Sequence, residues 1–251
     1  MHYKALLFDL DNTLIDFSFA EKQGLEKIYQ LYFSQCISSH EFEHCFRTIN
    51  KRLWHLVEQK HIAIDHLHPQ RFQSLTQTIK VTVDAMEIAH TYAQALGEYS
   101  HWYPNIKATL LNLKKHYAIG IITNGITQVK QIQYAKLEIA TFCDSFLVSE
   151  ILGISKPDKA IFNLALQQLN VNANEALMIG DSLSSDYQGA INANLDFCWV
   201  NKPAQFLPLA YPAPKYMIQS VAELPDILTN QVKEHPLQGK IPINTCEPAI
   251  V

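Results

Sequence analysis

The sequence has few of the features that mark secreted, membrane-bound or nucleic-acid-binding proteins. Its five cysteines are odd in number, widely scattered and without a C-x-x-C pair, which favours free thiols in a reducing compartment over a disulfide framework. No apolar stretch approaches the roughly 18 residues of a membrane span. The N-terminus lacks the basic and apolar regions of a signal peptide. We therefore expect a cytoplasmic protein with no membrane partner.

Positive charge is also scarce. Lys and Arg number 20 against 24 for Asp and Glu, so the net charge is −4 and offers no basic surface for a nucleic-acid polymer. A small anionic substrate would then need a metal ion or a few lysines. At 251 residues and 48% hydrophobic content, the chain is long enough for one large domain or two smaller ones with a substantial core.

Two carboxylates spaced two residues apart are the most informative feature that is present. Asp9 and Asp11 follow residues 5–8, an apolar run with the length and composition of a buried strand. In an α/β sheet such a strand delivers its last residues to the carboxyl edge, where ligands bind. Two acids there repel each other unless a cation lies between them or one keeps a proton; a plain turn is the alternative. An EF-hand loop is excluded, because Leu14 and Ala20 stand where it needs Gly and Glu.

The apolar residues of positions 16–100 follow a helical spacing, over a segment too long for an ordinary connection. The pattern predicts four helices inserted as a separate domain, with Ser38 or Ser39 capping the second and Pro69 at the start of the third. Several histidines in this segment form no i, i+4 pair, so we expect them to face solvent rather than bind a metal. They are His55, His61, His66 and His68.

Strand and helix patterns alternate from Pro104 onward, which predicts a parallel sheet wrapped by helices. The expected strands are residues 118–122, 145–148, 176–179, 197–200 and a short last one at 216–218. The first strand has to join this sheet, so we expect an α/β core domain of residues 1–15 and 101–229 around the helical domain of residues 16–100. Residues 230–251 show no periodicity and are expected to form a C-terminal tail.

Three further motifs follow predicted strands, which brings them beside Asp9 at the carboxyl edge. Thr123-Asn124-Gly125 offers a hydroxyl, an amide and backbone N–H groups to a phosphate. Lys156 precedes Pro157, the expected first residue of a helix, and its charge would offset the repulsion between the aspartates.

The third of these motifs contains Asp181 and Asp186. Magnesium prefers oxygen ligands and takes one or two carboxylates while keeping several waters. Asp9 and Asp181 are the candidate ligands, with Asp186 orienting Lys156 or a metal-bound water. Each motif alone has a structural explanation as a turn, a cap or a solvated lysine, but their combination favours a phosphate-handling site.

Together the four motifs, in this order and spacing, resemble the haloacid dehalogenase superfamily of phosphotransferases over residues 1 to about 229. The resemblance implies a Rossmann-like parallel-sheet core with an inserted four-helix cap of the C1 type. It implies that Asp9 is the nucleophile and forms an aspartyl-phosphate. Asp11 would be the general acid and base, with its main-chain carbonyl on Mg²⁺, and Asp181 a further metal ligand supported by Asp186.

The other motif residues receive roles from the same resemblance. Thr123, Asn124 and Lys156 would bind the phosphate, and Thr13 would stabilise the loop after the nucleophile. An acid at position 11 favours phosphate-ester hydrolysis over the 2-haloacid dehalogenases of the superfamily, because a halide leaves without a proton. A non-catalytic phosphate-binding regulatory protein is the alternative from another class, and the complete motif set counts against it.

Substrate choice is expected in the cap, which in this superfamily closes over the site. The candidate residues are Phe17 near the hinge and Asn50, Lys51 and Trp54 in the second helix. This stretch resembles the pyrimidine 5'-nucleotidase branch; an aromatic plane can stack a base and an amide can read its edge. Phosphoglycolate or a sugar phosphate stays open as substrate, and both a monomer and a homodimer stay open.

One small departure from the family pattern is Asn105, at a position where the family usually has Gly.

Overall fold

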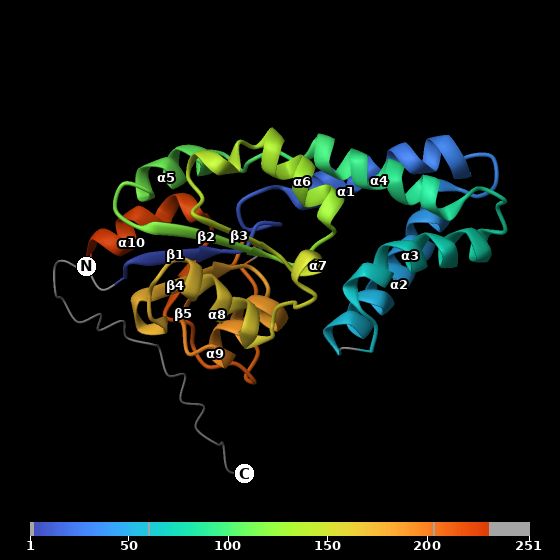
Figure 1. Cartoon of the computed structure of the whole chain (residues 1–251). Helices are drawn as coiled ribbons and strands as arrows, with labels where there is room; N and C mark the ends of the chain where they lie inside the picture. The colour runs from blue at the N-terminus through green and yellow to red at the C-terminus, as the bar shows by residue number, and fades with distance from the viewer. Residues whose placement is uncertain (1–2, 60, 203, 231–251) are drawn as a thin grey trace, which may run out of the picture.

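A six-stranded parallel sheet forms the centre of the computed structural model, which describes residues 3–59, 61–202 and 204–230 (Figure 1). The strand order is β3-β2-β1-β4-β5-β6. The strands are β1 (Ala5–Phe8), β2 (Ala118–Thr123), β3 (Ser145–Val148), β4 (Ala176–Gly180), β5 (Asp196–Val200) and β6 (Tyr216–Ile218). The parallel α/β sheet predicted from the alternating pattern is therefore confirmed, including its short last strand.

The helices fall into a group before β2 and a group that alternates with the later strands. The first group is α1 (Phe17–Ile28), α2 (Ser39–Glu58), α3 (Ile64–Ile79), α4 (Ala85–Tyr99) and α5 (Ile106–Leu113). The second is α6 (Thr127–Lys136), α7 (Ser149–Leu152), α8 (Lys159–Gln168), α9 (Gln188–Asn192) and α10 (Leu224–Asn230). None of the helices in the described ranges is both long and apolar enough to cross a membrane. Beyond Asn230, the tail predicted for residues 230–251 lies outside the described residues.

Both faces of the sheet are covered, which explains why its strands read as continuous apolar runs. Helices α5 and α10 cover one face of the sheet, and α8 and α9 cover the other (Figure 1). Side chains alternate along a strand, so Leu6 and Phe8 pack on the side of α5 and α10, and Ala5 and Leu7 on the side of α8 and α9. All four are fully buried. Burial of one Leu or Phe side chain contributes roughly 1.5–3 kcal/mol, so β1 is fixed firmly at the middle of the sheet.

The helices α1 to α4 pack around an aromatic core of their own, beside the sheet (Figure 1). Phe46, Phe72 and Tyr92 lie in mutual ring contact there, with centroids 5.4 to 6.2 Å apart. The chain leaves the sheet region at Ile15 and returns at Trp102, and these two residues pair as an isolated antiparallel bridge. The helical segment therefore begins and ends at neighbouring points.

The starts of α2 and α3 show where the capping rules apply and where packing overrides them. Ser38 caps α2 as predicted, in a capping box with Glu41. The prediction that Pro69 begins the third helix was wrong, because α3 begins at Ile64 and contains Pro69 in its interior. A proline there removes one backbone hydrogen bond. The helix continues through it because its later turns bury Phe72 in the bundle core.

Asn105, the departure from the family pattern, has a simple structural explanation. It precedes α5 with φ 65°, in the left-handed region that favours glycine. Asn is among the residues that tolerate this region best, so the substitution preserves the turn.

His68 is an exception to the prediction that the histidines face solvent. His61 and His66 are exposed, but His68 is 7% exposed, and its Nε2 lies 2.9 Å from the carbonyl oxygen of Ala89. A carbonyl only accepts, so Nε2 carries the proton and donates. The prediction failed for His68 because it lies on the face of α3 that packs into the bundle. Within the described ranges, no histidine belongs to a cluster that could hold a metal ion.

The burial of His68 predicts a loss of stability in mild acid. Burial lowers the pKa of His68 from 6.5 to about 4. The unfolded chain therefore binds a proton below pH 6.5 that the folded chain takes up only near pH 4, so the free energy of unfolding falls across this interval. The full effect is about 3 kcal/mol.

Chemical denaturation at pH 7, 5.5 and 4.5 measures this effect. His68→Gln keeps a donor for Ala89 and is expected to flatten the pH dependence. His66→Gln, on the exposed side of the same helix, is the matched control and should keep the wild-type slope. Equal slopes for wild type and His68→Gln would contradict the assignment.

Candidate active site

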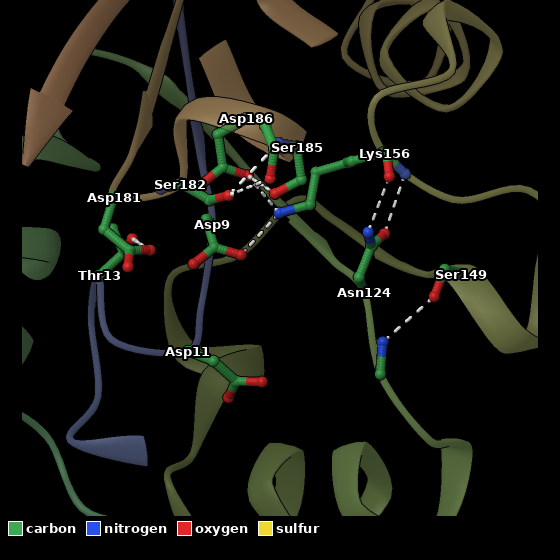
Figure 2. A network of polar contacts seen from close by, with 12 residues as sticks. Asp9, Asp11, Thr13, Asn124, Ser149, Lys156, Asp181, Ser182, Ser185 and Asp186 are labelled. Carbon is green, nitrogen blue, oxygen red and sulfur yellow. Dashed lines mark hydrogen bonds and ion pairs between the residues drawn. The ribbon is translucent and has the colours of Figure 1, made fainter. Parts of the chain in front are cut away.

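The carboxyl edge of the sheet gathers the predicted site residues. Asp9 follows β1, Thr123 ends β2 and Asp181 follows β4, and these three strands are neighbours. Asp9 and Asp181 lie close together with Asp186, and one carboxylate oxygen from each lies within 4.8 Å of the others (Figure 2). The positions of Asp9 and Asp181 at strand ends thus predicted that these two acids lie close together.

Lys156 is the cation of this cluster. Its Nζ lies 2.6 Å from Oδ1 of Asp9 and 2.6 Å from Oδ1 of Asp186, and the residue is 1% exposed (Figure 2). Burial acts to lower the pKa of Lys156, but the two carboxylates outweigh it and raise this pKa above its usual value. Lys156 therefore stays charged and holds Asp9 in place.

The segment around Lys156 differs from the prediction in one respect. The expected helix start at Pro157 was wrong, since α8 begins at Lys159 with Asp158 as its cap. The Asp158 carboxylate accepts a hydrogen bond from the N–H of Ala160. This side-chain cap places the start of the helix after Asp158 rather than at Pro157.

Asn124 is occupied by Lys156 rather than left free for a phosphate. Its Nδ2 donates to the Lys156 carbonyl oxygen and its Oδ1 accepts from the Lys156 N–H, both at 2.9 Å (Figure 2). This pair of bonds clamps the backbone of Lys156 against the end of β2. The side chain of Asn124 therefore positions Lys156, and phosphate binding by Asn124 stays a prediction.

The Thr123 side chain, unlike that of Asn124, is free to contact a ligand. The residue is fully buried, and its Oγ1 has no hydrogen-bond partner among the described residues. A buried hydroxyl without a partner costs about 1–3 kcal/mol, so this group is available to an oxygen of a ligand. The N–H of Gly125 donates to Ser149 Oγ at 3.1 Å, which fixes the turn after Thr123.

The acidic cluster carries more negative charge than Lys156 can balance. Burial, and next the charge of Asp9, raise the pKa of Asp181 to about 8. Burial also raises the pKa of Asp186 to about 6, against the opposing effect of Lys156. Thr13, fully buried, donates to Asp181 Oδ1 at 3.1 Å and orients it. Three carboxylate groups around one lysine fit a divalent cation with oxygen ligands such as Mg²⁺.

Asp11 is separate from this cluster and is paired with Lys130, a residue that the sequence reasoning missed. Lys130 Nζ lies 2.5 Å from Asp11 Oδ2 and donates to Gln133 Oε1 at 2.9 Å. The other oxygen, Asp11 Oδ1, is buried without a partner in the described part of the chain. Burial raises the pKa of Asp11, and the charge of Lys130 counteracts it. Gly125 makes room for this lysine, because a Cβ there would lie 2.3 Å from Lys130 Cε.

A cavity of about 210 Å³ opens beside Asp11, between the helical bundle and the sheet edge. Phe17, Asn50 and Trp54 line it, as expected for specificity residues, and Trp54 also packs against the bundle core. Lys51 is exposed and absent from the lining, so this cavity gives no support to its predicted role in specificity. The neighbouring position on α2 points elsewhere because side chains one residue apart do not share a helix face. Lining residues that the sequence did not suggest include Glu21, Arg71, Tyr92 and Lys130.

This arrangement agrees with the comparison to known protein families. Residues 6–200 match the family model of the haloacid dehalogenase-like hydrolases. The chain belongs to this family. Membership confirms the family expected from the four motifs.

Individual relatives cover nearly the whole chain. Pyrimidine 5'-nucleotidase YjjG of Escherichia coli is 31% identical over 231 residues, covering 91% of this chain and 99% of the relative. N-acylneuraminate-9-phosphatase of Mus musculus is 29% identical and covers 90% and 93%. The solved structure of the HAD-hydrolase YfnB from Bacillus subtilis, bound to magnesium, has a TM-score of 0.79 at 28% identity and covers 91% of this chain and 99% of its own.

Proposed function

We propose that this hydrolase is a magnesium-dependent phosphomonoesterase that acts on pyrimidine nucleoside 5'-monophosphates. The observation that carries the proposal is the division of acids at the sheet edge. Asp9 is held by Lys156 inside the acidic cluster, whereas Asp11 lines the cavity with one carboxylate oxygen free of partners in the described structure. An ester needs both a nucleophile and an acid, and a halide needs only the first. The assignment therefore favours a phosphatase over a dehalogenase.

The reaction has two steps. Asp9 attacks phosphorus, the bond to the ester oxygen breaks, and Asp11 gives its proton to the departing alkoxide. Asp11 then takes a proton from water as the water attacks the aspartyl-phosphate, which releases phosphate and restores Asp9. The Lys156 ammonium and the Thr123 hydroxyl stabilise the charge on the phosphoryl oxygens, and Asn124 keeps Lys156 in place.

Mg²⁺ would be held by Asp9, Asp181 and the main-chain carbonyl of Asp11. When bound it supplies positive charge that neutralises the phosphoryl oxygens. Asp186 would stay with Lys156, which its carboxylate already contacts. The acidic cluster supports this assignment, and so does the similarity to a solved structure bound to magnesium.

The helical segment of residues 16–100 is proposed as a C1-type cap on a core domain of residues 1–15 and 101–229, in a cytoplasmic enzyme. Trp54 would stack the base and Asn50 would contact its edge, because both line the cavity beside Asp11. The similarity to the pyrimidine 5'-nucleotidase of Escherichia coli supports this substrate class. The similarity to an N-acylneuraminate-9-phosphatase keeps a sugar phosphate as the second candidate.

A phosphate-release screen tests the substrate class. We expect kcat/KM for UMP, dUMP and dTMP to exceed that for AMP, phosphoglycolate and hexose phosphates by about tenfold or more, because a shaped polar pocket discriminates at this level. Release should stop when Mg²⁺ is removed with a chelator and return when it is added back. A tenfold lead for phosphoglycolate or a hexose phosphate would overturn the nucleotidase assignment and leave the phosphatase assignment standing.

A further inference from the structure

Arg71 is a buried cation without a counter-ion in direct contact. It lies on α3, is 4% exposed and lines the cavity beside Asp11. Among the side chains that the structure describes, no carboxylate oxygen lies within 4.0 Å of its guanidinium, and its Nε has no hydrogen-bond partner. Its clearest contact is with the Phe46 ring, whose centroid lies 5.7 Å from the guanidinium carbon.

Keeping the Nε–H of a buried guanidinium without a hydrogen-bond partner is unfavourable, because the lost hydration of this donor is not replaced. Burial accordingly lowers the pKa of Arg71. A buried donor at a cavity wall is satisfied when a ligand with an acceptor atom enters the cavity. The position of Arg71 thus indicates a ligand acceptor at the bundle end of the cavity, away from the acidic cluster.

Asn50 supplies the complementary group. It lies on α2 and lines the same cavity, and its Oδ1 is buried with no partner in the described ranges. An amide oxygen accepts only from a donor, so the ligand must also present an N–H or O–H. A hydrogen-bond donor and a hydrogen-bond acceptor, both without a partner in the part of the chain that the structure describes, therefore line one cavity.

The charge around Arg71 argues against a second anionic group on the ligand. Glu21 lines the same cavity, and its carboxylate interacts electrostatically with Arg71 and accepts from Arg47 at 3.4 Å. The positive charge of Arg71 is therefore partly offset before any ligand binds. A neutral acceptor such as a ring carbonyl suits this environment better than a carboxylate, which Glu21 would repel.

We infer that Arg71 and Asn50 are the specificity-determining residues for the base: Arg71 donates to a ring carbonyl and Asn50 Oδ1 accepts from a ring N–H. The imide edge of uracil or thymine presents this combination on a flat ring. Trp54 and Phe17, which also line the cavity, provide aromatic surface for that ring. The inference rests on the proposed function, since the phosphate of the same substrate has to reach Asp9.

The first test compares UMP with ribose 5-phosphate, which has the same phosphate and a sugar but no base. In Arg71→Met the ratio of kcat/KM for UMP to that for ribose 5-phosphate is expected to fall by about 10- to 100-fold, the range for a hydrogen bond to a charged group. Arg71→Lys, which keeps the charge without the planar fork, should recover part of the ratio. Arg52→Met removes an exposed arginine of α2 and should keep the wild-type ratio.

The second test needs no change to Arg71 and so does not depend on the folding of that variant. UMP methylated at ring N3 lacks the N–H proposed to meet Asn50. Wild type is expected to prefer UMP over this analogue by about tenfold or more, and Asn50→Ala should largely abolish the preference. Thermal unfolding of each variant reports its folding separately.

The outcomes separate this inference from the proposed function. Hydrolysis of ribose 5-phosphate that depends on Mg²⁺ and Asp9 measures the phosphatase activity without any contribution from base recognition. If it persists while the ratio is unchanged in Arg71→Met, or while wild type accepts the N3-methyl analogue as well as UMP, the base-recognition inference is wrong. A higher wild-type kcat/KM for a carboxylate-bearing sugar phosphate than for UMP also overturns the inference. If wild type hydrolyses neither UMP nor ribose 5-phosphate, the proposed function fails and the inference fails with it.

Discussion

Asp9→Asn is expected to reduce phosphate release from every substrate by at least about 10⁴-fold, because an amide cannot form the aspartyl-phosphate. The change keeps the size of the side chain and an oxygen that accepts from Lys156, which also remains bonded to Asp186. The loss should therefore appear in kcat with little change in folding. Phosphate release from p-nitrophenyl phosphate with Mg²⁺, together with thermal unfolding, measures both quantities.

Asp84→Asn is the matched control for this variant. Asp84 is exposed and caps α4 through a bond to the Met86 N–H, and asparagine caps a helix equally well. Its activity and stability should equal those of wild type. Magnesium-dependent turnover in Asp9→Asn at the wild-type rate would show that the chain uses another nucleophile or that the activity comes from a contaminant.

The acidic cluster was predictable because its members follow strand ends. Asp9 and Asp181 come directly after short apolar runs, and parallel strands bring such residues to one edge whatever their separation in the chain. Lys156 was found by its position in a recognisable motif. Asp186 was found in a different motif, the one that also contains Asp181. Its ion pair with Lys156 is one of the two contacts expected for it.

Lys130 and Arg71 could not be found in this way. Both lie inside helices, where a lysine or arginine usually faces solvent and where no spacing marks it as unusual. Only tertiary packing shows that α6 turns Lys130 toward Asp11 and that α3 turns Arg71 into the cavity. The sequence shows which face of a helix is buried only through its apolar residues. Lys130 and Arg71 are charged, so their position on the buried face could not be predicted.

The errors at His68, Pro69 and Pro157 have the same origin. In each case a local preference, for solvent or for a helix start, was overridden by packing or by a competing cap. His68 is buried because the neighbouring turns of α3 contribute Phe72 to the bundle core. Local rules therefore failed at these three positions, although they placed the cap of α2 correctly, whereas the residues at the sheet edge followed from the ends of the predicted strands.

Asp11→Asn should separate the two steps of the reaction. Asparagine keeps the main-chain carbonyl proposed for Mg²⁺ and an oxygen that accepts from Lys130, but it no longer moves protons. The kcat for UMP is expected to fall by about 10²- to 10⁴-fold, the usual contribution of general acid–base catalysis. p-Nitrophenolate leaves without a proton, so the first step with p-nitrophenyl phosphate should remain fast while hydrolysis of the aspartyl-phosphate becomes slow.

The expected signature is a burst of p-nitrophenol, about one equivalent per active site, followed by slow turnover. Intact-mass spectrometry at the end of the burst should show phosphorylated protein in Asp11→Asn and none in Asp9→Asn. A deficit of equal size for UMP and p-nitrophenyl phosphate, with no burst, would mean that Asp11 supports the position of Asp9 rather than proton transfer. The free oxygen of Asp11 argues for the burst, because it lies at the wall of the cavity proposed to hold the leaving group, whereas Lys156 holds Asp9.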